Sequence, residues 1–446
     1  MDLRLLPGTH PMIYPWDVGA SGGWKAILTG LIAGVLVGLV VTAFVGYTDR
    51  AGLTSGLGAL DRSYFKGVFW AAGLFALLLL WPMDARIKKH LAIIWILRGF
   101  VTLGAMLFYE YHYVTLDAFS YYRHALRGEF DPHFFWLNGT NTVMILVSMA
   151  MRNLPGMDSY HALKVLWSAF GLAGGVFFWR TYVAMTDRSD LRVLWVFCAF
   201  PSILFWTSIL GKDPLVFLGL SIMTYAAVRV FGQITAGALV LFVVGLMIVA
   251  AIRLWTASAV LLALALCFLR METKKSSSLM LAKVAMWCAL VFSMGTMVDN
   301  FQISSRAELL DRVNVMSRGW SAGGSQQEVP ELKSLPQIIR FLPLGMFTAL
   351  FRPLPGEVPN AFGLLSGLEN LLVLFLAGLG FSWFRREFLE DRKLQFLMLT
   401  VLIWSMLYAF ISFQNLGSAV RFKVQVLPFL LMIPYIIRHK RMALSE

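Results

Sequence analysis

Residues 235–252 read TAGALVLFVVGLMIVAAI, and after one charged residue, Arg253, residues 254–269 continue as LWTASAVLLALALCFL. A helix that crosses a membrane needs roughly 20 apolar residues, because each residue adds about 1.5 Å to a hydrocarbon path of about 30 Å. The connection at Arg253 is so tight that the two runs are predicted to be antiparallel neighbouring helices. Runs of this kind recur along the chain and predict an all-α membrane protein.

Composition supports the same class. Of the 446 residues, 58% are hydrophobic and 14% are charged, and the mean hydropathy is +0.70. Soluble domains carry about 25% charged residues, which excludes a water-solvated globular protein. The net charge is +13, but the basic residues punctuate apolar runs instead of clustering on a polar face. They indicate membrane topology, and nucleic acid is not expected as a partner.

The apolar runs bounded by charged residues predict a polytopic helical membrane protein with about twelve transmembrane helices. The candidate spans are 26–47, 67–83, 91–109, 162–184, 193–210, 214–231, 235–252, 254–269, 279–298, 361–384, 394–412 and 422–437. Four regions follow from them: an N-terminal segment with a first hairpin at 1–83, a transmembrane core at 84–298, an outer loop at 299–360 and C-terminal spans at 361–446.

Orientation follows from the basic residues, which are enriched in cytoplasmic loops. Alternate loops carry most of them, at 86–90, 188–192, 270–275, 385–393 and 438–441. Both termini are therefore expected in the cytoplasm. The long loops 110–160 and 299–360 then lie outside, and their short apolar stretches 142–151 and 338–351 are expected to form interfacial or re-entrant helices.

Ionisable residues near hydrocarbon are costly, so those at the outer ends of the spans are candidates for function. Asp117 follows the third span, with Tyr121 and His124 on the same helical face. A carboxylate here suits proton transfer from a hydroxyl or binding of a divalent cation. Capping of the next helix is the equally weighted alternative.

A second group lies between the fifth and seventh spans. Pro201 is expected to break its helix, and the turn at 211–213 brings Lys212 and Asp213 to membrane depth. These two residues suit a functional site or simple interface anchoring. Arg253 suits binding of a lipid phosphate, with snorkelling to the interface as the alternative.

Two further segments add polar residues to the outer side. The first contains Arg352 and Glu357, and the second contains Asn415 and Arg421 at the mouth of the last span pair. Arg98 and Arg180 lie inside predicted spans, and Arg98 in particular requires a partner within the bundle.

These stretches resemble the integral-membrane glycosyltransferases of the GT-C class, above all bacterial polysaccharide polymerases and sugar transferases. The resemblance rests on four stretches: 117–124, PheProSerIleLeuPheTrp with GlyLysAsp at 200–213, ArgProLeuProGlyGlu at 352–357, and AsnLeuGlySerAlaValArgPheLys at 415–423. It implies transfer of a sugar from a polyprenyl phosphate or diphosphate carrier, outside the cytoplasm, in cell-surface polysaccharide or glycolipid synthesis. In this class the acidic residue of the first outer loop is the base or metal ligand. Asp117 would hold that place, although here it follows the third span, with an extra hairpin at 26–83 before it.

The resemblance and the chemistry together give a full hypothesis. Asp117, with Asp213 or Glu357, is expected to transfer the proton. The expected substrate-binding residues are Tyr121, His124, Lys212, Arg253, Arg352, Asn415 and Arg421. Tyr122, Phe134, Phe135 and Trp136 add apolar faces for a sugar ring. The expected ligands are the lipid-linked donor and a saccharide acceptor in a bacterial cytoplasmic membrane. No resident cofactor is assigned, and a divalent cation remains open.

Two other classes compete with this hypothesis. A transporter or flippase of lipid-linked oligosaccharide is expected to show midplane charges and broken helices or inverted halves. A scaffold subunit of a polysaccharide-export complex would not need cations at the mouths of its spans, although docking to assembly partners stays open. No nucleotide-binding loop or common hydrolase motif is present.

Overall fold

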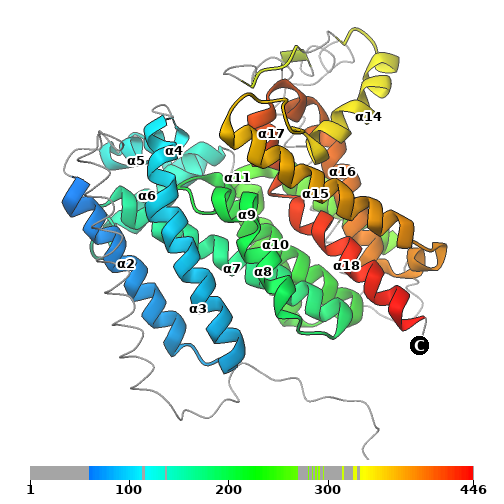
Figure 1. Ribbon diagram of the computed structural model, residues 1–446, viewed down its shortest axis with the longest axis horizontal. Coiled ribbons are helices and arrows are strands. Elements are labelled where there is room, and N and C mark those ends of the chain that lie inside the picture. The colour runs from blue at the N-terminus through cyan, green and yellow to red at the C-terminus, as the bar shows by residue number, and fades with distance from the viewer. Residues whose placement is uncertain are drawn as a thin grey trace, which may run out of the picture.

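The computed structural model describes residues 60–112, 116–135, 138–269, 325–328 and 332–444, together with isolated residues between 280 and 315. Within these ranges every regular element is a helix, and the β-pairing is limited to one isolated bridge between Gln326 and Asn415. Figure 1 shows the long helices as a bundle with α4, α5, α6 and α17 at its upper end and the C-terminus at its lower end. The expectation of a helical membrane protein is therefore confirmed.

Short connections join most of the described helices, and 65 residues separate the end of α11 from the start of α14. They are α2 (Leu60–Leu80), α3 (Ala85–Phe100), the π-turn η1 (Val101–Ala105), α4 (Met106–His112), α5 (Asp117–Arg127), η2 (Pro132–Phe134), α6 (Gly139–Asn153), α7 (Tyr160–Thr186), α8 (Leu191–Ala199), α9 (Pro201–Trp206), α10 (Lys212–Gly232), α11 (Ala236–Leu269), α14 (Leu335–Phe351), α15 (Ala361–Trp383), η3 (Arg386–Glu390), α16 (Arg392–Gln414), α17 (Leu416–Lys423) and α18 (Leu427–Ala443).

The predicted number of about twelve spans is not confirmed. In the part of the chain that is described, 7 helices are long and apolar enough to cross a membrane, or up to 8 if α17 and α18, bent by 56°, form one broken span. The predicted span 193–210 is divided, because Pro201 ends α8 and starts α9. The predicted span 26–47 lies outside the described residues, and 279–298 is described only at isolated positions.

The two predicted helices at 235–252 and 254–269 are the limbs of α11. Arg253, between them, has non-helical backbone angles. Gly245 on the first limb packs against Gly219 of α10. On the second limb, Phe268 stacks on Phe231, at the far end of α10 from the Arg253 partner Asp213. The chain therefore reverses at Arg253, and both limbs lie against α10 as antiparallel neighbours.

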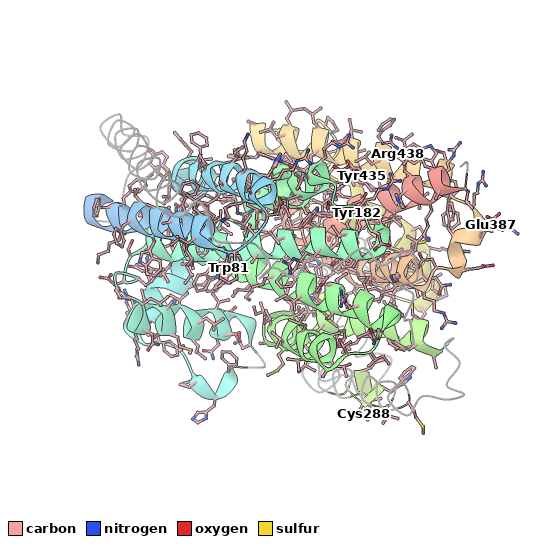
Figure 2. All side chains as sticks on the ribbon, turned by 90° about the horizontal axis from the view of Figure 1, so that it is seen from below. Trp81, Tyr182, Cys288, Glu387, Tyr435 and Arg438 are labelled. Carbon is pink, nitrogen blue, oxygen red and sulfur yellow. The ribbon has the colours of Figure 1, made fainter. Side chains whose placement is uncertain are left out.

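Four of the five predicted inner loops gather at one end of the bundle, and the fifth, 270–275, lies outside the described residues. Trp195 donates to His90 at 2.9 Å, and Lys393 donates to the carbonyl of Ala184 at 3.3 Å. Lys440 pairs with Asp391 at 2.6 Å. Figure 2 views the bundle from below, with Trp81, Glu387 and Arg438 labelled. The two long predicted outer loops also contain the expected helices, α6 and α14.

Polar side chains cap the N-termini of several of these helices. The Asp84, Ser159 and Asp391 side chains accept hydrogen bonds from the first free N–H groups of α3, α7 and α16. Such caps matter more in a membrane, where water cannot satisfy an exposed N–H group. Short polar residues between apolar runs therefore fix where each helix begins.

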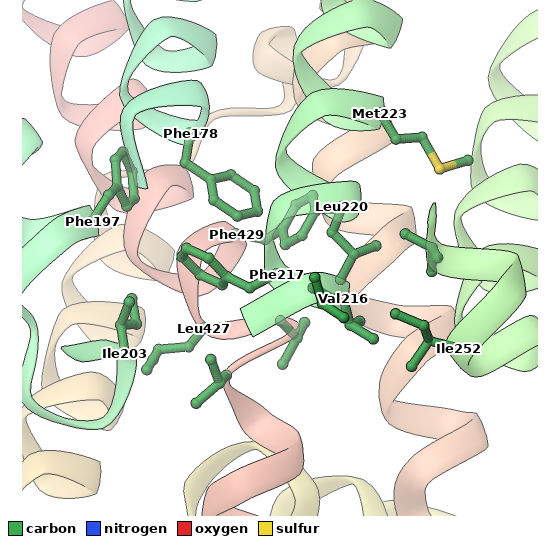
Figure 3. Close-up of a cluster of buried hydrophobic side chains, with 14 of the residues drawn as sticks. Phe178, Phe197, Ile203, Val216, Phe217, Leu220, Met223, Ile252, Leu427 and Phe429 are labelled. Atoms are coloured by element: carbon green, nitrogen blue, oxygen red, sulfur yellow. The ribbon is translucent and has the colours of Figure 1, made fainter. Parts of the chain in front are cut away.

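The core is largest where α7, α8, α10 and α18 meet. Phe178 packs on Phe217 at 5.1 Å and on Phe429 at 5.6 Å between ring centroids. Figure 3 shows these rings with Phe197, Ile203 and Leu220 around them. All are buried, so the segments that carry polar outer residues are fixed by an apolar centre.

The break at Pro201 leaves backbone groups that two charged side chains satisfy. In a continuous helix the Cys198 carbonyl would accept from the N–H of Ser202. Instead, Arg98 donates to that carbonyl at 3.1 Å and to the Thr207 carbonyl at 2.9 Å, and the Ser202 N–H donates to Glu369 at 2.8 Å. The buried Arg98 thus has the bundle partners that its position requires.

We predict that Arg98→Met lowers the stability of the protein strongly. Each of the two buried carbonyls it leaves unsatisfied should cost about 1–3 kcal/mol. Thermal unfolding in detergent provides the measurement. Arg180→Met is the matched control, because Arg180 is exposed on α7 and should change little. Equal melting temperatures for the two variants would show that Arg98 does not support the broken helix.

Candidate functional site

A buried carboxylate joins three segments at the upper end of the bundle. Asp213, in the first turn of α10, accepts from Arg253 at 3.1 Å and from Arg421 at 2.5 Å. Its side chain is 2% exposed and that of Arg253 is 5% exposed. A buried carboxylate of this kind requires its cations, so the turn of α11, the start of α10 and α17 are held together.

Arg421 extends the network to α5. Its NH1 group donates to Asp117 at 3.1 Å, and the Asp117 side chain is 56% exposed. Asp117 is not the cap of α5, since Leu116 takes that position without a side-chain hydrogen bond. Tyr121 lies one turn later and is buried beside these charges, and burial, with the nearby Asp117 carboxylate, raises its pKa. Tyr121 therefore stays neutral as a hydroxyl group.

Lys212 completes a set of five charges that we name the Asp213 cluster: Asp117, Lys212, Asp213, Arg253 and Arg421. Lys212 donates to Thr140 of α6 at 2.7 Å, and the other four groups act on it electrostatically. Aromatic rings cover two of the cations: Arg253 lies 4.7 Å from the Phe422 ring centre and Arg421 lies 5.8 Å from that of Trp206. Four segments distant in sequence thus meet at this cluster.

One donor in this cluster has no partner. The NH1 atom of Arg253 is buried and makes no hydrogen bond within the described part of the chain. A buried unsatisfied guanidinium nitrogen costs free energy. A ligand with an anionic oxygen could satisfy it. The Arg253 side chain is 5% exposed and paired with Asp213, so it does not snorkel to water.

An apolar groove of about 570 Å³ adjoins the Asp213 cluster between α6, α7, α10 and α11. Its lining includes Ile252, next to Arg253, and Leu215, close to Asp213. Trp167 also lines it and donates to the carbonyl of Gly211 at 3.0 Å. Met149 and Met247 line it and are exposed, so the groove opens on the outer surface of the bundle. The groove therefore reaches residues that are close in sequence to Arg253 and Asp213, although none of the five charged side chains lines it.

Arg352 and Glu357 form a separate pair in the loop between α14 and α15. Arg352 donates to both Glu357 oxygens, at 2.8 and 3.0 Å. Partial burial acts to raise the pKa of Glu357, but hydrogen bonds from Arg352 and from the Leu354 N–H outweigh it and lower that pKa. Lys423, two residues after Arg421, donates to the Arg352 carbonyl at 3.0 Å. The loop is therefore attached to α17, beyond the Asp213 cluster.

The remaining predicted site residues make local contacts. Asn415 caps α17 by accepting from the Ser418 N–H at 3.1 Å, and it also accepts from Ser325. The exposed His124 lies 2.7 Å from the carbonyl of Ser120 in its own helix. Neither is seen to bond to the Asp213 cluster.

Sequence reasoning missed two contributors, Thr140 and Trp167. Thr140 holds Lys212, and Trp167 links the groove to the start of α10. In the sequence, Thr140 is one threonine within the predicted outer loop 110–160, and Trp167 is one tryptophan within an apolar run, so neither has a pattern that distinguishes it. Within the described ranges, no three His, Cys, Asp or Glu side chains lie close enough to hold a metal ion.

We predict unequal stability effects for the two aspartates. Asp213→Asn leaves two guanidinium groups without their carboxylate and should cost about 3–5 kcal/mol. Asp117→Asn removes one partly exposed ion pair and should cost at most about 1 kcal/mol. Unfolding in detergent measures both. If Asp117→Asn proves the more destabilising, the burial argument for Asp213 fails.

Comparison of the chain with protein-family models, with curated proteins and with solved structures gives no match. The site is therefore interpreted from its own geometry.

Proposed function

We propose that this protein is a membrane glycosyltransferase that uses a polyprenyl-linked sugar donor at the extracytoplasmic face. The Asp213 cluster is its active site, and both termini lie in the cytoplasm of a bacterial cell. The basic loops 86–90, 188–192, 385–393 and 438–441 support this orientation, because positive loops stay on the cytoplasmic side. The product is a glycosidic bond in a cell-surface polysaccharide or glycolipid.

The observation that carries the proposal is the Asp213 cluster of buried and paired charges, together with an apolar groove whose lining includes Ile252 and Leu215, close in sequence to Arg253 and Asp213. A lipid-linked sugar combines a hydrocarbon chain, an anionic phosphate and a polar sugar. A protein that binds it needs an apolar channel open to lipid, cations at the end of that channel, and a carboxylate beyond the cations. The groove would supply the first of these features, and the cations and carboxylates of the Asp213 cluster would supply the other two.

The proposed step is a displacement at the anomeric carbon. The acceptor hydroxyl oxygen forms the new bond to that carbon, and its proton passes to Asp117. The bond between the anomeric carbon and the phosphate oxygen breaks, and the electron pair leaves with the phosphate. Lys212, Arg253 and Arg421 stabilise the negative charge that develops on the leaving group.

The burial of the two aspartates separates their roles. Asp213 has both oxygens bound to guanidinium groups and is 2% exposed, so it positions the arginines. Asp117 is 56% exposed and has one cationic partner, so it remains accessible to an acceptor hydroxyl. Asp117 is the better proton acceptor of the two.

A flippase for lipid-linked saccharide is the second candidate. The observation in its favour is the set of interrupted helices: α8 and α9 are divided at Pro201, α11 reverses at Arg253, and α17 bends against α18 by 56°. Transporters often place their binding sites at such breaks. A transport site requires no proton acceptor, which is what distinguishes the two candidates.

We predict that Asp117→Asn lowers sugar transfer by about 100- to 10,000-fold, the usual contribution of a general base. The assay uses purified protein, a lipid-linked sugar donor and a saccharide acceptor. Asp117→Glu should retain part of the activity. Asp158→Asn is the control, because Asp158 is an exposed carboxylate paired with Lys66.

Normal transfer by a folded Asp117→Asn protein would remove the base assignment. Accelerated passage of the lipid-linked sugar across vesicle membranes, without transfer to an acceptor, would instead favour the flippase.

A further inference from the structure

We infer that the donor carries a single phosphate, as a polyprenyl phosphodiester, and not a diphosphate. The inference rests on the proposed function and concerns the charge and the donors of the Asp213 cluster. Both kinds of donor share the hydrocarbon chain and the sugar. They differ by one negative charge at the position where the cluster would bind them.

The charges of the cluster are unequal. Lys212, Arg253 and Arg421 contribute three positive charges, and Asp117 and Asp213 contribute two negative charges. The other four charges act electrostatically on Lys212, and the two aspartates act on Arg421. The formal excess is one positive charge. Because an unbalanced charge is costly in a poorly hydrated site, the complementary ligand has one negative charge.

The available hydrogen-bond donors agree with the charge. Asp213 and Asp117 already take three guanidinium nitrogens of Arg253 and Arg421. The NH1 atom of Arg253 remains unpartnered, and Lys212 uses one of its three N–H groups on Thr140. Arg421 also keeps N–H groups that the two aspartates do not take, so all three cationic side chains can donate to the oxygens of a phosphate group.

Charge balance also holds through the reaction. A phosphodiester donor brings one negative charge and neutralises the cluster. When the sugar leaves, the released phosphate monoester gains a second negative charge, while the proton that passes to Asp117 raises the cluster to two positive charges. The site is neutral before and after transfer. A diphosphate donor would leave one negative charge uncompensated throughout.

The groove limits the rest of the ligand. The groove is about 570 Å³ in volume, and its lining includes Ile252 and Leu215, which are close in sequence to Arg253 and Asp213. A single isoprenoid chain can enter from the lipid-facing side near Met149 and Met247. One apolar channel at one phosphate position suits a single-chain carrier better than a phospholipid with two chains.

Native mass spectrometry of the full-length protein tests the inference by comparing three lipids. They are a polyprenyl phosphoryl sugar with one negative charge, a polyprenyl diphosphoryl sugar with two, and phosphatidylglycerol, which has one charge but no sugar. We expect the phosphodiester sugar to bind about tenfold or more tightly than either alternative, since one unpaired charge at close range is worth at least that factor.

Two variants change the cluster by one charge in opposite directions. Lys212→Met makes it neutral and should weaken binding of the phosphodiester sugar about tenfold or more. Asp117→Asn raises it to two positive charges and should shift the preference towards the diphosphate. Lys66→Met, which removes a partly exposed cation paired with Asp158, is the control and should leave all three affinities unchanged. Thermal unfolding confirms that each variant is folded.

The outcomes separate the inference from the proposed function. Equal or tighter binding of the diphosphate sugar by the wild-type protein, or a preference that Asp117→Asn does not move, overturns the inference. If that diphosphate sugar is also transferred to an acceptor, the proposed function stands alone. If phosphatidylglycerol binds as tightly as the sugar lipids and neither is transferred, both conclusions fail.

Discussion

The upper end of this bundle depends on the buried carboxylate of Asp213. Its two oxygens bind Arg253, at the reversal of α11, and Arg421, on the short helix α17. A carboxylate that is almost fully buried is stable only with cations against it, and each guanidinium in turn requires an anion. The contact therefore fixes three segments that the chain brings from widely separated positions. Asp117 on α5 and Lys212 beside it then gain defined positions.

The interrupted helices explain why so many polar groups meet here. A continuous helix satisfies its own backbone and presents side chains only from its surface. At Pro201, at Arg253 and between α17 and α18 the chain stops being continuous. Each interruption exposes backbone groups that polar side chains must satisfy, as Arg98 and Glu369 do around Pro201. The interruption at Arg253 also places this charged residue directly after Ile252, which lines the apolar groove. Most of these polar groups therefore stabilise the fold. In the Asp213 cluster, the NH1 atom of Arg253 has no partner within the described residues and is left for the proposed ligand.

Much of this could be predicted from the sequence, but not the pairings. Apolar length predicted the all-helical membrane class, and the lone Arg253 between two apolar runs predicted the reversal within α11. The rule that charges near hydrocarbon are functional selected Asp117, Asp213, Arg253 and Arg421. The same rule selected Arg352 and Glu357, which bind each other. The rule could not show which of these charges pair with one another, because it measures the cost of a charge and not the distance to its partner. The count of about twelve spans is not confirmed: hydropathy does not show that Pro201 divides the run 193–210, and two other predicted spans, 26–47 and 279–298, lie wholly or mostly outside the described residues.

The sequence by itself determined that this is a membrane protein, the positions where most described helices begin, and which residues are too polar for an apolar environment. These properties are local: they depend on the length of an apolar run, on a capping side chain, or on the position of a proline. Only the tertiary structure decided that Asp213 holds both arginines, that Thr140 holds Lys212, and that four helices enclose an apolar groove. Such contacts depend on the packing of helices against one another, and their free energy appears only once distant segments are a few ångströms apart.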